Sequence, residues 1–323
     1  MKKVIILATG GTIAGTGAAG AATNYSAGEL SVGELLAGVP GIERLAELAR
    51  IQVCNVSSDD ITGSHLLRLA REINAQAGDS SVAGFVITHG TNTMTETAYF
   101  LNLTVKTDKP VVLTGAIRPA TALSADGPVN LYEAVAAASN PACAGRGVLI
   151  IFDGGIYGAR DIHKISTRSA CAFGGRDAGA LGYMLEGVPR FYHRSERAHT
   201  TRSEFDVDKV TELPAVAILY AHQDADPDII DWAASRHAGI VIAGMGSGCY
   251  SEPWNDKVAA LTMPVVRASR VANGPSMHDD FYDKYPHVLL ADDLPPQKAR
   301  ILLQLGLTVT SSPDRLREMF ARY

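Results

Sequence analysis

Three side chains in this 323-residue chain stand where hydroxyl and amine chemistry is possible: Thr12, Thr91 and Lys164. Thr12 follows two glycines in "TGGT", which let the backbone turn tightly and present a hydroxyl beside free N–H groups. A nucleophile and oxyanion donors are the two parts that acyl transfer needs. A threonine is also a good helix N-cap, and position alone favours that simpler role for Thr12.

A second polar cluster, "THGTNTMTET" at residues 88–97, follows the apolar run "VAGFVI", which is typical of a buried strand. It places His89, Thr91, Asn92 and Thr93 at the mouth of that strand. A single N-cap residue is enough to start the next helix, so the surplus of polar residues predicts a site. We expect His89 to orient the loop.

Lys164 lies in "ARDIHKIST", a polar loop that follows another buried run. Surface lysines usually serve only to solvate the chain. A lysine near threonine hydroxyls can instead act as a base if partial burial lowers its pKa. The sequence leaves both roles open.

Other apparent motifs carry less weight. The match of "GTGAAG" to a dinucleotide fingerprint is weak because no helix follows the first strand directly, and we expect this loop to be a mobile lid. The chain shows no metal-ligand spacing, so we expect no metal site. The residues considered for a metal were His193, His199, His278 and the four cysteines Cys54, Cys143, Cys171 and Cys249.

The elements that must position these residues alternate along the chain. Continuous apolar runs are separated by amphipathic stretches such as "SHLLRLAREINAQ", a pattern typical of parallel sheets covered on both faces. A polar interval from about 187 to 212 separates five such runs from four. The sequence therefore predicts two α/β domains, a larger N-terminal and a smaller C-terminal one, each with a parallel sheet. We place them at 1–190 and 213–323, joined by a linker at 191–212.

Polar and glycine-rich segments follow each of the five N-terminal runs. They read "TGGTIAG", "SSDD", "THGTNT", "GAIRP" and "DGGIYGARDIHK". Ligands of open α/β sheets bind beyond the carboxyl ends of the strands. Any one segment suits a turn and a cap, but several at one edge favour a small-molecule site.

Composition narrows the class of partner. The chain is 46% hydrophobic and 20% charged with a net charge of -5, which is ordinary for a soluble protein and argues against nucleic acid or an anionic membrane as a partner. No apolar run has a transmembrane length, and the run after "MKK" is too short for a signal peptide. The four cysteines are far apart and lack any CxxC spacing, so we expect a cytoplasmic, reduced protein.

Several long motifs, taken in order, identify a relationship. They are "ATGGTIAG", "THGTNTMTETAYFL", "KPVVLTGAIRP", "LSADGPVNLYEAV", "ARDIHKIST", "AGMGSG", "VVRASRV" and "PPQKARILLQLGLT". With these motifs the chain resembles, from end to end, the bacterial L-asparaginases of the amidohydrolase family that includes the glutaminase-asparaginases. The resemblance implies two α/β domains and a homotetramer built as a dimer of dimers. It also implies hydrolysis of the side-chain amide of asparagine, or of glutamine in some members, without metal or cofactor.

The resemblance also assigns roles to the residues that match its motifs. Thr12 is the nucleophile that forms the acyl-enzyme, and Tyr25 lies next to it on the mobile loop. Thr91 is the second hydroxyl, and Lys164 is its base partner.

Three further positions bind substrate in the family. Ser58 holds the α-carboxylate, and Ala116 offers its carbonyl to the leaving amide. An acid from the C-terminal domain of a neighbouring subunit completes the family site. Asp279 is the nearest equivalent here, with Asp280 as the alternative.

The chain departs from the family pattern at two binding positions. Asn92 stands where the family usually has an aspartate, and Asp59 stands where it usually has a glutamine and occasionally a glutamate. Both positions belong to the wall that binds the substrate ammonium. We interpret the pair as a negative charge moved from position 92 to position 59. Cys249 replaces a common asparagine, and the cysteines of the periplasmic members' disulfide are absent.

The leading hypothesis is therefore an L-asparaginase that converts L-asparagine to L-aspartate and ammonia. One alternative is a glutaminase-asparaginase that accepts L-glutamine and other ω-amides. Another is a non-catalytic amino-acid-binding homologue that has lost the usual carboxylate at position 92. The retained Thr12, Tyr25, Thr91 and Lys164 favour the enzyme.

Overall fold

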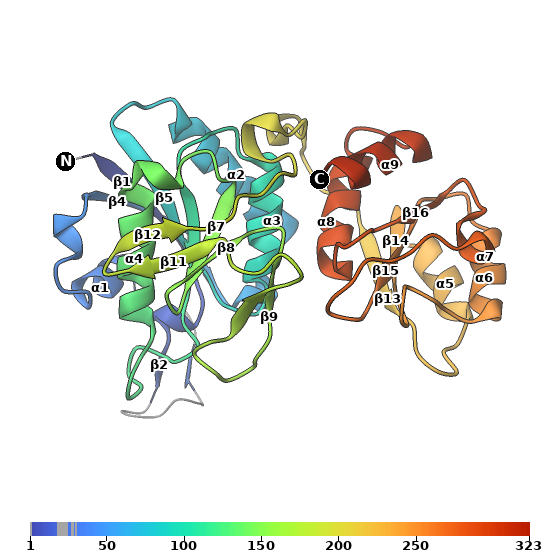
Figure 1. Cartoon of the computed structure of the whole chain (residues 1–323), viewed down its shortest axis with the longest axis horizontal. Helices are drawn as coiled ribbons and strands as arrows, with labels where there is room; N and C mark the ends of the chain where they lie inside the picture. Colours follow the sequence, from blue (N-terminus) through green and yellow to red (C-terminus); the bar gives the residue numbers. More distant parts are fainter. Residues whose placement is uncertain (1, 18–24, 27–28, 30) are drawn as a thin grey trace. The chain divides into compact units, whose positions relative to one another are not determined.

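The computed structural model describes residues 2–17, 25–26, 29 and 31–323, with only the backbone of residues 25 and 26. The chain divides into two compact units, Met1–Val207 and Asp208–Tyr323 (Figure 1). The N-terminal unit thus includes most of the interval expected to be a linker. Within that interval Phe205 and Val207 are buried, and Arg71 donates a hydrogen bond to the Val207 carbonyl.

The N-terminal unit is built on an eight-stranded sheet with the order β12-β11-β8-β7-β6-β5-β1-β4. Strands β4, β1, β5, β6 and β7 are parallel, and β8, β11 and β12 extend one edge in antiparallel pairs. The strands are β1 (Lys3–Gly10), β4 (Glu47–Val56), β5 (Val82–Thr88), β6 (Val111–Thr114), β7 (Val148–Phe152), β8 (Gly155–Gly158), β11 (Gly182–Leu185) and β12 (Val188–Phe191). Two small hairpins add β2 (Thr16–Gly17) with β3 (Tyr25–Ser26), and β9 (Ile162–Lys164) with β10 (Phe173–Gly175).

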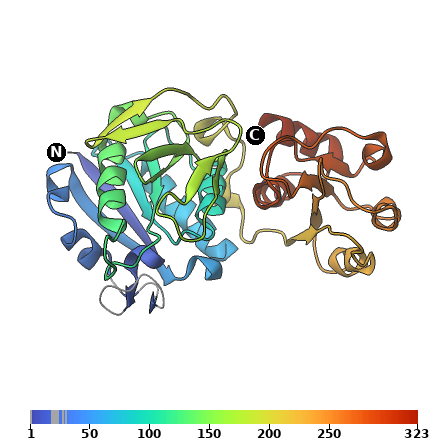
Figure 2. The ribbon, with the colours of Figure 1, turned by 60° about the horizontal axis from the view of Figure 1, so that its bottom comes forward.

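Helices cover both faces of the parallel part of this sheet (Figures 1 and 2). Successive side chains of a strand point to opposite faces. Val4 and Ile6 pack with α1 and α4 in one core cluster. Helix α3 packs against β6 and β7 and contacts α2, which also packs on β4 and β5. The helices are α1 (Val32–Ala37), α2 (Gly63–Ala77), α3 (Met94–Thr104) and α4 (Gly127–Ser139).

The C-terminal unit has its own four-stranded parallel sheet, with the order β13-β14-β15-β16. Helix α5 packs on β13 and β14 and contacts α6, and α8 packs on β13, β14 and β15. The elements are β13 (Val216–Tyr220), β14 (Gly239–Gly244), β15 (Val265–Ser269), β16 (Val288–Leu290), α5 (Asp228–Ala234), α6 (Glu252–Ala259), α7 (Asp280–Asp283), α8 (Pro296–Leu307) and α9 (Pro313–Arg322).

The expectation of two α/β units is confirmed, and the nine predicted runs coincide with the five parallel strands of the first sheet and the four of the second. The first sheet is mixed rather than wholly parallel, because β8, β11 and β12 add antiparallel strands at one edge. These three strands were not predicted from the sequence. Among the described residues, no helix combines the length and apolar character needed to cross a bilayer.

Candidate active site

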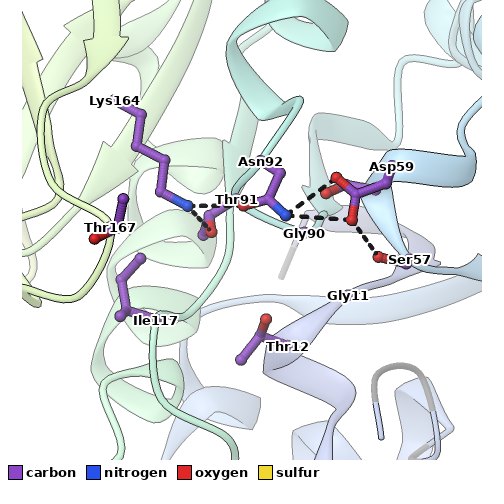
Figure 3. Close-up of a pocket in the computed structure, with 11 residues that line it drawn as sticks. Gly11, Thr12, Ser57, Asp59, Gly90, Thr91, Asn92, Ile117, Lys164 and Thr167 are labelled. Atoms are coloured by element: carbon purple, nitrogen blue, oxygen red, sulfur yellow. Dashed lines mark hydrogen bonds between the residues drawn. The ribbon is translucent and has the colours of Figure 1, made fainter. Parts of the chain in front are cut away.

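A polar pocket of about 290 Å³ opens at the carboxyl edge of the parallel strands. It is formed by segments that follow β1, β4, β5 and β6 and by the end of β9 with the loop after it. The lining residues are Gly11, Thr12, Ser57, Ser58, Asp59, Gly90, Thr91, Asn92, Ile117, Lys164 and Thr167 (Figure 3). The pocket therefore lies where the sequence predicted a small-molecule site.

Two glycines allow three of these segments to approach closely. Gly11 has a φ of +82°, and a Cβ on it would lie 2.4 Å from the backbone nitrogen of Gly90. A Cβ on Gly90 would in turn lie 2.8 Å from the Ser58 hydroxyl oxygen. Any side chain at either position would push the loops apart.

Thr12 begins a short 3₁₀ helix, Thr12–Ala14, directly after this glycine turn. The N-cap of that helix is Gly11, so Thr12 does not have the simple capping role that its position suggested. The Thr12 residue is only 9% exposed, and its side chain reaches the pocket (Figure 3). Its hydroxyl is thus held at the pocket wall beside the backbone of Gly11.

Lys164 ends strand β9 and reaches Thr91 across the pocket (Figure 3). Its Nζ donates a 2.9 Å hydrogen bond to Thr91 Oγ1. Partial burial lowers the pKa of Lys164, and the carboxylate of Asp59 opposes this by stabilising the charged form. The lysine is thus easier to deprotonate than an exposed one, and it lies beside a hydroxyl.

Asn92 links Lys164 to Asp59 (Figure 3). Its Oδ1 accepts a 2.9 Å hydrogen bond from Lys164 Nζ. Its Nδ2 donates to the two carboxylate oxygens of Asp59 at 3.1 and 3.3 Å. Ser57 Oγ donates to Asp59 Oδ2 at 3.0 Å from the other side. The two departures from the family pattern are therefore in direct contact.

His89 orients the loop, as its position in the sequence predicted. It is fully buried, and Nδ1 donates to the Gly90 carbonyl at 2.7 Å while Nε2 lies 2.9 Å from Thr97 Oγ1. Burial lowers the pKa of His89 to about 4, so the ring is neutral near pH 7. Thr93 Oγ1 also donates to the Ser58 carbonyl at 2.7 Å, which joins this loop to the segment after β4.

The segment after β6 is fixed by the start of α4. Asp126 accepts 2.9 Å hydrogen bonds from the backbone nitrogens of Ile117 and Arg118. Ile117 lines the pocket, whereas its neighbour Ala116 is buried and is not among the lining residues. Ser58 is buried too, and it does line the pocket.

Three other residues proposed from the sequence are not among the described lining residues of the pocket. Tyr25 pairs through its backbone with Gly17, and its side chain lies outside the described residues. Asp279 belongs to the C-terminal unit, where it caps α7 by accepting a 2.9 Å hydrogen bond from the Phe281 nitrogen. The side chain of Asp280, the alternative, is fully exposed and contacts His278.

Five lining residues were not identified from the sequence as site residues: Gly11, Ser57, Gly90, Ile117 and Thr167. Thr167 follows Lys164 by three positions in "KIST", and Ser57 stands in "SSDD" after the second strand, so both carried a usable signal. Ile117 is apolar and carried none.

The lining offers one carboxylate, one amine and several hydroxyls, a set that suits a small zwitterion. No group of three or more His, Cys, Asp or Glu side chains in the described part of the chain is arranged to hold a metal. The four cysteines, all described, are unpaired.

Residues 3–197 match the family described as "Asparaginase, N-terminal", and residues 215–320 match "Glutaminase/Asparaginase C-terminal domain". The chain is 42% identical to L-asparaginase 2 of Escherichia coli, over 100% of this chain and 94% of that protein. It is 43% identical to a glutaminase-asparaginase of Acinetobacter glutaminasificans, over 100% of both. It is 42% identical to a probable periplasmic L-asparaginase of Haemophilus influenzae, over 99% of this chain and 93% of that protein.

A solved structure shares the fold throughout. The crystal structure of a probable cytoplasmic L-asparaginase from Campylobacter jejuni matches with a TM-score of 0.97 at 42% identity, and the match covers 100% of both chains.

Proposed function

The chain belongs to the asparaginase family of amidohydrolases, and from this premise we propose that it is an L-asparaginase. It hydrolyses the side-chain amide of L-asparagine to give L-aspartate and ammonia. The observation that carries the proposal is the pocket in which Thr12 lies with the hydrogen-bonded pair of Thr91 and Lys164.

In the proposed reaction, Thr12 Oγ1 attacks the amide carbon of the substrate and loses its proton. The amide nitrogen then takes up a proton, the C–N bond breaks, and ammonia leaves. An aspartyl ester of Thr12 remains. Water attacks the ester carbon, and aspartate leaves as Thr12 recovers its proton. Neutral Lys164, through Thr91, accepts and returns protons, a role that its lowered pKa supports. Tyr25 has the catalytic role beside Thr12 that its match to the family motif implies.

Four residues hold the substrate in this scheme. Ser58 binds the α-carboxylate, Asp59 and Asn92 bind the α-ammonium, and the Ala116 carbonyl accepts from the amide nitrogen. Asp59 is the one carboxylate among the described lining residues, so it is the charged partner for the ammonium.

We further propose a homotetramer built as a dimer of dimers, in which Asp279 of a neighbouring copy completes each site. The proposed location is the cytoplasm. The four unpaired cysteines favour it, as does the similarity to a probable cytoplasmic enzyme. A homologue named as periplasmic stands against it. Sedimentation with parallel activity measurements tests the assembly, because a fully active monomer would contradict it.

Glutaminase-asparaginase activity is the second candidate, since relatives with that name are as similar to this chain as the asparaginases are. A non-catalytic amino-acid binder is the third. Ammonia release from asparagine and glutamine, measured side by side, separates the three. Thr12→Ala should abolish turnover while the circular dichroism spectrum and the melting temperature stay close to those of the parent. Substantial remaining activity would exclude Thr12 as the nucleophile.

A further inference from the structure

The Asn92 side chain joins the two oppositely charged groups of the pocket, and its orientation is fixed by their chemistry. An ionised carboxylate can only accept hydrogen bonds, and an ammonium can only donate them. The amide must therefore turn Nδ2 toward Asp59 and Oδ1 toward Lys164, which is the arrangement observed. Asp59 thus holds a hydrogen-bond acceptor against the lysine.

No other charged side chain among the lining residues competes with this pair. Helix α3, which packs against β9, carries Glu96, and Arg176 follows β10, the partner strand of β9. Neither of them lines the pocket, and neither does Asp60, which is next to Asp59 in the chain. The negative charge that opposes the effect of burial on the pKa of Lys164 is that of Asp59. The protonation of Lys164 therefore depends on the charge of one carboxylate, that of Asp59.

We propose that the ammonium group of an amino-acid substrate, on binding Asp59, drives the proton off Lys164 through the Asn92 amide. The inference rests on the proposed function for the identity of the ligand. It makes Asn92 a positioning residue that acts through Lys164.

Two effects act in the same direction. The bound ammonium offsets the carboxylate charge and repels the charged lysine, so the neutral amine is favoured. It also competes for the Asp59 oxygens that hold the Asn92 amide. The hydrogen bond that Lys164 Nζ donates to Asn92 Oδ1 then weakens, because hydrogen bonds in such a chain strengthen one another. The proton passes to bulk water. The lysine is left with a free lone pair beside Thr91, able to accept the hydroxyl proton.

The consequence is that substrate binding converts Lys164 into an active base. In the free protein Lys164 stays protonated, so it cannot accept a proton from Thr91. Only a ligand with an ammonium group at Asp59 produces the neutral lysine. Water and simple amides lack that group, so Lys164 remains protonated in their presence.

The first measurement is the pH dependence of turnover of L-asparagine. The acidic limb of kcat/KM reports the free protein, and that of kcat reports the complex. The limb of kcat should lie at lower pH. Coincident limbs, or a limb of kcat at higher pH, would overturn the inference.

The second measurement needs no turnover. L-asparagine is titrated into the Thr12→Ala variant by calorimetry, at a pH between the two limbs and in two buffers of different ionisation enthalpy. Binding should release roughly half a proton or more per site. Adding Lys164→Met should remove this release, because the methionine has no proton to lose. Release that persists without the lysine would show another source and would overturn the inference.

The Asn92→Leu change, made in the Thr12→Ala protein, tests the amide itself. Leucine keeps the volume and removes both hydrogen bonds, so most of the proton release should be lost. Ser57→Ala is the matched control, because it removes a hydrogen bond to Asp59 and leaves the amide bridge intact. Equal release from Asn92→Leu and Ser57→Ala would overturn the role of Asn92. Absence of any asparagine binding would contradict the proposed function, whereas binding without release contradicts only this inference.

Discussion

The contact between Asp59 and Asn92 predicts that their substitutions act on catalysis as a coupled pair. Asn92→Asp would replace the Nδ2 donor, which lies 3.1 and 3.3 Å from the Asp59 oxygens, by a second carboxylate. At about 4 Å two such charges repel by about 1 kcal/mol in water and by about 4 kcal/mol at an effective dielectric constant near 20. Asp59 is exposed, so the lower part of this range applies. The second carboxylate also stabilises the protonated form of Lys164 by a similar free energy, so kcat/KM at neutral pH should fall by roughly 5- to 30-fold.

Asp59→Gln acts differently, because it removes the charge that the substrate ammonium meets. A hydrogen bond to a charged group contributes about 1 kcal/mol more than a neutral one, so kcat/KM should fall by roughly 5- to 10-fold. The double variant has one carboxylate again, now at position 92. It should recover to within about 10-fold of the parent, which gives a coupling free energy of about 1–3 kcal/mol.

The assay is kcat/KM for ammonia release by the parent, the two single variants and the double variant. Asp59→Gln combined with Glu43→Gln is the control, since Glu43 is exposed and does not line the pocket. That pair should show additive effects. Strict additivity of the Asp59 and Asn92 changes would refute the idea that the charge has moved between them. Asn92→Asp alone should also raise the pKa of Lys164 and shift the acidic limb of kcat/KM to higher pH.

Three predictions concern stability. Gly11→Ala should lower the melting temperature and the activity more than Gly41→Ala, because both have a φ of +82° but only Gly11 would meet neighbouring backbone. Asp283→Ala should cost about 3–5 kcal/mol in urea unfolding, because Arg267 is fully buried and Asp283 pairs with it. Burial lowers the pKa of His89 to about 4 from 6.5, so the unfolded chain takes up the proton first as the pH falls through this window. Stability should therefore drop by on the order of 3 kcal/mol from above pH 6.5 to below pH 4, and unfolding of His89→Gln should lack this part of the drop.

The parallel strands were readable from the sequence because they are buried on both faces. In β1 the residues from Val4 to Gly10 are all buried, and those from Val4 to Ala8 form a continuous apolar run. Strands β11 and β12 lacked such a signal. They are four residues long, and Tyr183, Leu185 and Val188 are about half exposed, so their apolar residues do not mark a core.

The site was readable where topology alone brings residues together. Thr12 and Thr91 follow strands β1 and β5, which are neighbours in the sheet, so the rule for carboxyl ends applies to both. Lys164 comes from a small hairpin outside the main sheet, and only the composition of its loop pointed to it. The hydrogen bonds of Asn92 depend on side-chain rotamers across 33 residues of sequence, which no local pattern encodes.

The pocket draws its lining from the first part of the chain, between Gly11 and Thr167, and the unit that contains it ends at Val207. Domains fold as units during synthesis, the N-terminal one first, at about 5–20 residues per second. Ribosomes therefore need roughly 6–23 s to add Asp208–Tyr323 after the first unit is complete. All residues that line the pocket have been added to the chain before that interval begins. An amino acid that binds this pocket as proposed would stabilise a folded first unit by mass action while the second is still being translated.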